Sequence, residues 1–199
     1  MYKKNDKKRC KKETRQDLIR LRDNDPDFTE LNWSFRRVGD EGVKALAEML
    51  MTNNTLNTLN IAHNDIGAEG GKALGEMLRK NKTLNTLDIS DNNIGEEGGK
   101  AAAEMLMTNN TLNTLDISNN KIGDEEGKAL AEMVTKNKTL NSLDISDNKI
   151  GDEGGKALAE MLMTNITLNI LNVSYNHMVN GLSSSITAFV DSNDTLWKQ

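Results

Sequence analysis

The residue types that usually carry acid–base, nucleophilic or metal chemistry are rare in this sequence. It has one cysteine, Cys10, and two histidines, His63 and His177. No Ser-His-Asp set, phosphate-binding glycine loop or zinc-ligand spacing accompanies them, and the acidic segments lack the ligand order of an EF-hand. The sequence therefore predicts a protein that is not an enzyme, with no metal site, no cofactor and no small-molecule substrate.

Charge is distributed unevenly along the 199 residues. Residues 1–22 contain ten Lys or Arg and three Asp or Glu, a net charge of +7, whereas the rest contains fifteen and twenty-seven, a net charge of −12. We expect no nucleic-acid binding by the acidic body, because phosphate recognition needs clustered positive charge. The basic arm, residues 1–13, is expected to be disordered, with weak contact to anionic lipid or to nucleic acid as the alternative.

Composition also bears on where the protein works. No apolar run approaches the length of about 18 residues that a membrane span requires, and the basic N-terminus is not followed by the apolar core of a secretory signal. A single cysteine cannot form an intrachain disulfide, which fits a reducing compartment. We therefore expect a cytoplasmic protein that does not enter membranes.

The chain is built from a repeated unit of 28 residues, which is the pattern of a stacked repeat architecture. Four close copies and a diverged fifth begin at Thr55, Thr83, Thr111, Thr139 and Thr167. A more divergent copy precedes them, so that six units fill residues 27–194.

Each unit changes its hydrophobic period in the middle. Leu59 and Ile61 are two residues apart, which is the spacing of one strand face. Leu74 and Leu78 are four residues apart and share one face of a helix. A single strand–helix unit cannot bury its apolar face alone, so the units must stack and share a continuous core.

This pattern, L-x-x-L-x-I-x-x-N-x-I-G followed by K-A-L-x-E-M-L, resembles the leucine-rich repeats of the ribonuclease-inhibitor-like class. The resemblance implies an α/β horseshoe, a solenoid with parallel strands on the concave face and helices on the convex face. It implies one domain over residues 14–199, with a capping helix at 14–22, six repeats at 27–194 and a C-terminal capping segment. It also implies a ladder of asparagines bonded to the turn backbone, formed by Asn64, Asn92, Asn120, Asn148 and Asn176.

A second asparagine column follows the helices. It consists of Asn53, Asn81, Asn109, Asn137 and Asn165. Because asparagine adopts the left-handed conformation at low cost, we expect each of these residues to end its helix in that conformation.

The segment LIRLRDNDPDFTELNWS resembles the start of the repeat domain of tropomodulins and leiomodins, which cap actin filaments. The Ran GTPase-activating protein shares the same repeat class. We therefore keep open, beside a general protein-binding scaffold, an actin-capping protein and a regulator of a small GTPase. Near-identical copies rich in Asn and Lys also keep open a secreted bacterial effector that acts on a host protein in the host cytoplasm.

The strand residues between the core positions are expected on the concave face. Stacked aspartates in one column there repel each other by roughly 1 kcal/mol per neighbouring pair in water. The predicted binding strip for a protein partner with a basic surface consists of Asp88, Asp116 and Asp144 with Ser90, Ser118 and Ser146. The alternative is a solvated acidic strip that duplication has copied.

One exposed column varies more between units than the scaffold does. It reads Phe35, His63, Asp91, Asn119, Asp147 and Tyr175. This variation between units is equally consistent with partner recognition and with sequence drift at exposed positions. We add Phe35, His63 and Tyr175 to the predicted partner-binding residues, because aromatic side chains give a large contact area.

Overall fold

The structure is a computed structural model that describes residues 14–179 and 181–186. Its strands are β1 (Glu30–Asn32), β2 (Thr58–Asn60), β3 (Thr86–Asp88), β4 (Thr114–Asp116), β5 (Ser142–Asp144) and β6 (Ile170–Asn172). Its helices are α2 (Gly39–Leu50), α3 (Ala68–Lys80), α4 (Gly95–Leu106), α5 (Asp124–Lys136) and α6 (Asp152–Leu162). None of the described helices is long and apolar enough to cross a membrane.

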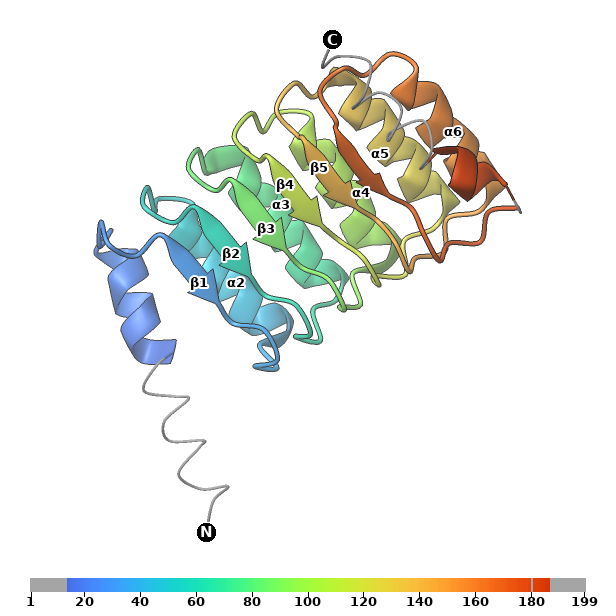
Figure 1. Cartoon of the computed structure of the whole chain (residues 1–199). Helices are drawn as coiled ribbons and strands as arrows, with labels where there is room; N and C mark the ends of the chain where they lie inside the picture. Colours follow the sequence, from blue (N-terminus) through green and yellow to red (C-terminus); the bar gives the residue numbers. More distant parts are fainter. Residues whose placement is uncertain (1–13, 180, 187–199) are drawn as a thin grey trace.

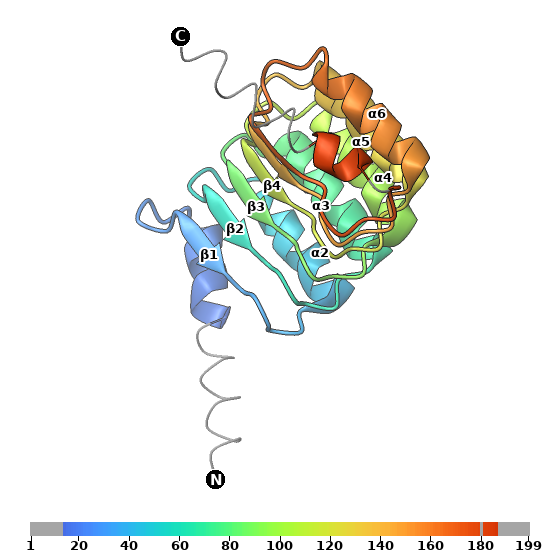
Figure 2. The same cartoon turned by 45° about the vertical axis from the view of Figure 1, so that its right-hand side comes forward.

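The strands form one parallel sheet in the order β1-β2-β3-β4-β5-β6. Each strand pairs with the next at an offset of one unit, so that Leu59 lies beside Leu87 and Asp88 lies beside Asp116. Figures 1 and 2 show the strands along the inner side of a curved stack and the helices along its outer side. The expected α/β leucine-rich-repeat horseshoe is therefore confirmed.

The core lies between the sheet and the helices. In the second unit the middle strand residue Leu59 and the helix residues Leu74, Met77 and Leu78 are buried. The strand residues on either side of Leu59 face the concave surface and are only half-buried. Each fully buried leucine stabilises the stack by about 1.5–3 kcal/mol, and every unit repeats this contribution.

Short helices lie at both ends of the described stack. Residues 14–22 form a helix whose Leu21 is buried, and Trp33 Nε1 donates a 2.8 Å hydrogen bond to Asp17 Oδ2. At the other end residues 182–186 are helical, and Ile186 is buried against the core. The rest of the expected C-terminal capping segment, residues 187–199, lies outside the described residues.

The asparagine ladder is present in the turns after the strands. The amide of Asn148 donates to the carbonyls of Ile117, Ile145 and Ser146 at 3.0–3.1 Å. Its carbonyl accepts hydrogen bonds from the backbone N–H groups of Asn120 and Ile122. One side chain thus bonds to the backbone of two neighbouring units, which satisfies polar groups that stacking buries.

The expected left-handed conformation of the second asparagine column is wrong. Asn81 has φ −66° and ψ 134°, and Asn137 has φ −71° and ψ 137°, so both are extended. The reason is side-chain bonding: Asn137 Nδ2 donates to the carbonyls of Leu106 and Asn109, while its Oδ1 accepts from Thr139 and Leu140. This column is a second buried ladder.

Aspartates also join the helix starts of neighbouring units. Asp40 Oδ1 accepts hydrogen bonds from the N–H groups of Gly67 and Gly70 at 2.7 and 3.0 Å. Asp124 does the same for Gly151 and Gly154. A carboxylate at a helix start satisfies unpaired N–H groups and favours the helix dipole, so these residues stabilise the junctions between units.

Candidate functional site

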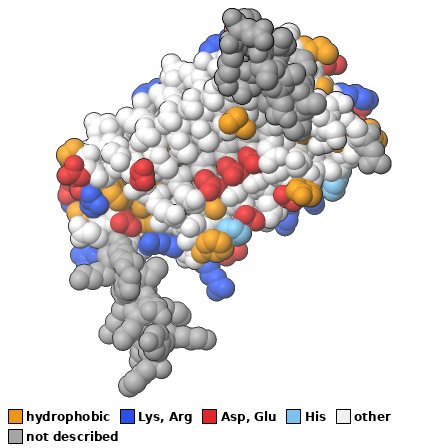
Figure 3. All heavy atoms as spheres, in the orientation of Figure 1, with side chains coloured by type: hydrophobic (Ala, Val, Ile, Leu, Met, Phe, Trp, Pro, Cys, Tyr) orange, Lys and Arg blue, Asp and Glu red, His pale blue; other side chains and the backbone are white. Residues whose placement is uncertain are grey.

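The concave sheet face presents a short acidic strip, which we define as Asp88, Asp116 and Asp144. They are the last residues of β3, β4 and β5, and they lie in register on neighbouring strands. Alternation along each strand directs them away from the core, and each is half-buried. Figure 3 looks onto this face and shows a row of acidic side chains across its middle.

Each aspartate of the acidic strip forms a local turn with the serine two residues later. Asp116 Oδ1 accepts hydrogen bonds from Ser118 N at 2.9 Å and from Ser118 Oγ at 2.7 Å. Ser90 and Ser146 donate in the same way to their aspartates. The hydroxyl hydrogens of the three predicted serines are therefore used within the turn, and only their lone pairs remain for a partner.

The second carboxylate oxygens of the three aspartates differ in whether they accept a hydrogen bond. Asn60 Nδ2 donates to Asp88 Oδ2 at 2.7 Å, and Asn172 Nδ2 donates to Asp144 Oδ2 at 2.8 Å. Asp116 lies between the other two aspartates, and no described residue donates to its Oδ2. Burial raises the pKa of Asp116, the hydrogen bonds from Ser118 oppose that shift, and repulsion by Asp144 and Asp88 adds to it.

Asparagine forms the same turn in the other units. Asn32 Oδ1 accepts from Ser34 N at 2.9 Å and from Ser34 Oγ at 2.7 Å, which is the geometry of the aspartate turns. Asn60 and Asn172 likewise accept the N–H group two residues later. The turn therefore needs a side-chain oxygen but does not need a negative charge.

A second row runs along the edge where the strands end, which we call the edge row. Its members all have left-handed φ angles between 49° and 59°, and they are Phe35, His63, Asp91, Asn119, Asp147 and Tyr175. Asparagine, aspartate and histidine adopt this conformation more readily than other side-chain-bearing residues. The backbone conformation thus accounts for the residue types at the middle positions of the edge row, from His63 to Asp147.

The two aromatic residues of the edge row are exceptions to this account. Phe35 is 72% exposed and Tyr175 is 81% exposed, and bulky residues rarely adopt a left-handed conformation. The Phe35 ring stacks on His63 with centroids 4.0 Å apart, and His63 Nε2 lies 3.0 Å from Asp91 Oδ2. Phe35 and Tyr175 follow β1 and β6, about 24 Å apart at the usual strand spacing, so they do not form one patch.

The remaining candidate chemistry is sparse within the described residues. Among them, no three His, Cys, Asp or Glu side chains are arranged to hold a metal ion. The two histidines lie in the second and sixth units, far apart along the stack. Cys10 lies outside the described residues.

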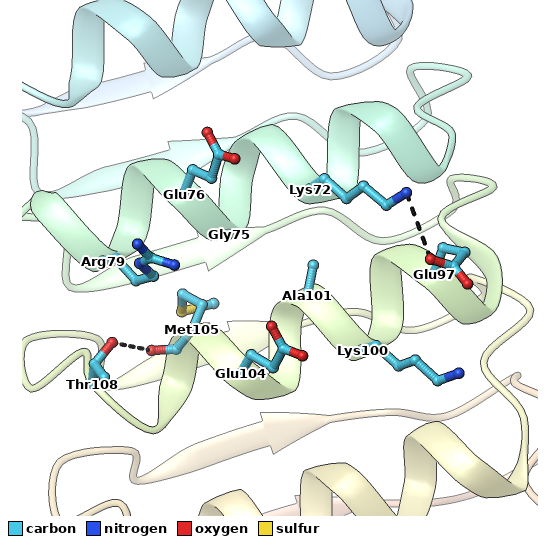
Figure 4. Close-up of a pocket in the computed structure, with 10 residues that line it drawn as sticks. All are labelled: Lys72, Gly75, Glu76, Arg79, Glu97, Lys100, Ala101, Glu104, Met105 and Thr108. Atoms are coloured by element: carbon cyan, nitrogen blue, oxygen red, sulfur yellow. Dashed lines mark hydrogen bonds and ion pairs between the residues drawn. The ribbon is translucent and has the colours of Figure 1, made fainter.

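A groove of about 430 Å³ lies between α3 and α4 on the helix side (Figure 4). Its charged lining is balanced, with three basic residues (Lys72, Arg79 and Lys100) and three acidic residues (Glu76, Glu97 and Glu104). Lys72 Nζ lies 3.5 Å from Glu97 Oε2. Because the opposite charges are equal in number, this groove indicates no particular ligand.

Comparison with known proteins agrees with the geometry of the fold. The family model described as Leucine Rich repeat matches residues 52–75, 80–101, 108–131 and 136–159. A search of curated proteins found no matching relative.

Two solved structures are similar to the chain over most of its length. Leiomodin-1 actin-binding site 2 is 21% identical with a TM-score of 0.58, covering 92% of this chain and 91% of that one. The C-terminal domain of a Caenorhabditis elegans tropomodulin is 14% identical with a TM-score of 0.55, covering 92% and 96%. At these identities the likeness concerns the fold alone. With family matches in four places on a parallel-strand solenoid, this chain is a leucine-rich repeat protein.

Proposed function

We propose that this protein is a non-enzymatic scaffold that binds a protein partner with a basic surface on its concave face. One observation carries the proposal. The third, fourth and fifth units have a carboxylate where the other units have an amide that makes the same turn. The turns gain nothing from the three charges. Asp88 and Asp144 each accept one further hydrogen bond, from Asn60 and Asn172, but Asp116 accepts none, and the three charges repel one another. A role in binding accounts for the row of charges.

The surroundings of the acidic strip support this proposal. None of the ion pairs between described residues includes Asp88, Asp116 or Asp144. Several helix lysines pair instead with glutamates on the helix side, as Lys128 does with Glu125. The negative potential of the strip is therefore directed to solvent, where it would attract a basic surface and speed its association.

The test replaces the strip without disturbing its turns. The triple variant Asp88→Asn, Asp116→Asn, Asp144→Asn keeps the side-chain oxygen that the serines bond to. We expect it to bind a fluorescent lysine-rich peptide about tenfold more weakly than wild type in low salt, measured by anisotropy. Proteins captured from a lysate by the wild type should be depleted on the variant.

A matched control separates this site from general charge. The variant Glu76→Gln, Glu104→Gln, Glu160→Gln changes the net charge equally but on exposed helix positions. We expect it to bind the peptide like wild type. Equal losses in both triple variants would reject the concave face as the binding site.

Actin is a second candidate partner. The observation that favours it is the likeness to the structure named for the second actin-binding site of leiomodin-1, which extends over 92% of this chain. If actin binds, the protein should sediment with filaments or slow the loss of pyrene fluorescence during depolymerisation. An absence of both effects would remove this candidate and leave the general proposal standing.

A further inference from the structure

The concave face has no covering element among residues 14–179 and 181–186, while the chain contains one strongly basic segment outside them. That segment is the arm, residues 1–13, with two acidic residues and seven basic ones, Lys3, Lys4, Lys7, Lys8, Arg9, Lys11 and Lys12. We propose that the arm is a tethered ligand of the concave face, and that it pairs its basic side chains with the acidic strip.

The point of attachment favours this placement. Arg36 Nη1 donates a 3.1 Å hydrogen bond to Thr14 Oγ1, and Arg36 lies in the turn directly after β1. The first described residue is therefore held at the edge where the strands end, by the side chain of Arg36. Figure 1 shows the helix at residues 14–22 beside β1, at one end of the sheet. The arm thus starts at the same edge as the acidic strip.

The arm is long enough to reach the whole strip. From β1 to β5 the sheet advances by four strand spacings, about 19 Å. Thirteen residues in an extended conformation span up to about 43 Å. From Thr14 to Lys11 an extended chain covers about 10 Å, which equals the two strand spacings from β1 to β3.

The spacing of the basic residues fits the three carboxylates. Lys7, Arg9 and Lys11 alternate along the arm, so in an extended conformation their side chains point to the same side, about 6.6 Å apart. Neighbouring aspartates of the strip lie on strands about 4.8 Å apart. The flexible stems of these side chains can absorb the difference, so that three cations meet three carboxylates that pair with no cation among the described residues.

The consequence depends on the proposed function of the acidic strip. A tethered segment has a millimolar effective concentration at its own site, so the arm would compete with a basic partner in solution. The chain would then bind such a partner only when the partner outcompetes its own N-terminus.

The only cysteine of the sequence, Cys10, lies between Arg9 and Lys11 and allows a direct test on the full chain. A nitroxide spin label on Cys10 should broaden the amide NMR signals of Ser90, Ser118 and Ser146 in low salt. The broadening should fall in high salt because ionic screening weakens the pairing. It should also disappear in the variant with Asp88→Asn, Asp116→Asn and Asp144→Asn, and persist in the variant with Glu76→Gln, Glu104→Gln and Glu160→Gln.

Two outcomes would overturn the proposal. One is broadening of these signals that is equally weak in wild type and in the triple Asn variant. The other is broadening only when labelled and isotope-enriched copies are mixed, which would mean that the arm binds a second copy of the chain.

The test is independent of the proposed function. Broadening in the wild type, with no charge-dependent peptide binding even by the variant Lys7→Glu, Arg9→Glu, Lys11→Glu, would support the arm and reject the scaffold proposal. Charge-dependent peptide binding without broadening would support the scaffold proposal and reject the arm. If both hold, the variant Lys7→Glu, Arg9→Glu, Lys11→Glu should bind the peptide several-fold more tightly than wild type.

Discussion

The asparagine ladders and the acidic strip are polar columns copied by the same repeat, yet their bonding differs. Asn148 makes five hydrogen bonds to the backbone of its own and adjacent units, and it is buried. Asp116 makes two, both to Ser118, and one of its oxygens has no partner among the described residues. Repetition alone therefore does not separate structure from function, whereas the bonds that each column makes do separate them.

The largest effect should come from the ladder in the turns. Asn148→Ala leaves several buried backbone groups without a partner, so we expect the free energy of unfolding to fall by about 3 kcal/mol or more. Urea denaturation followed by circular dichroism measures this. A loss below about 1 kcal/mol would mean that water or a rearranged turn replaces the side chain.

In the second ladder, one substitution distinguishes an extended Asn137 from a left-handed one. If Asn137 were left-handed, Asn137→Gly would be neutral or stabilising. Because Asn137 is extended and bonds four backbone groups, we expect a loss of about 2 kcal/mol or more on urea denaturation. Asn137→Ala should lose a similar amount, and a stable Gly variant would contradict the ladder.

Extending the acidic strip should cost stability. Asn60→Asp replaces the amide that donates to Asp88 with a fourth carboxylate. We expect a loss of about 1 kcal/mol in low salt, most of it recovered in 0.5 M salt because screening is strong there. Urea titrations at both salt concentrations measure the difference. An unchanged stability would show that the strip carries no significant repulsion.

Removing one charge from the acidic strip should change the free energy of unfolding least, and it should raise the stability instead of lowering it. The raised pKa of Asp116 means that its folded form holds the proton more tightly than the unfolded form. Its contribution to stability is therefore full below pH about 3.9 and is lost as pH rises through the folded pKa. We expect Asp116→Asn to stabilise the protein by up to about 1 kcal/mol at pH 7.

The same substitution should make no difference near pH 3, where the wild-type carboxylate is protonated. Unfolding free energies measured at both pH values give the comparison. Destabilisation at pH 7 would show that the turn needs the carboxylate itself.

The repeated core and the first ladder could be predicted from the sequence because each residue packs against its own copy one unit away. Leu59 against Leu87 is such a pair. The conformation of Asn81 could not be predicted in this way. Its amide donates to the carbonyl of Leu50 at the end of the preceding helix, a bond that recurs along the column but that helix-ending propensity does not reveal. Propensity alone favoured the left-handed conformation, and tertiary hydrogen bonds override it.

The candidate site was predicted only in part for a related reason. The acidic strip follows from strand alternation, but the matching asparagine turns needed coordinates. The links made by Asp40, Asp124 and Asp152 were missed because two intervening units carry Ala68 and Glu96 at that position, so the column is interrupted. The left-handed edge row did leave a signal, since His63, Asp91, Asn119 and Asp147 are types that tolerate that conformation.

We propose that the acidic strip serves binding and not folding. The most direct test measures both properties on the variant with Asp88→Asn, Asp116→Asn and Asp144→Asn: the free energy of unfolding in urea and the affinity for the lysine-rich peptide. We expect a free energy of unfolding within about 1 kcal/mol of wild type, because the relief of repulsion offsets the loss of the hydrogen bonds from Asn60 and Asn172, together with about tenfold weaker binding. A larger loss of stability, or binding equal to wild type, would contradict this expectation.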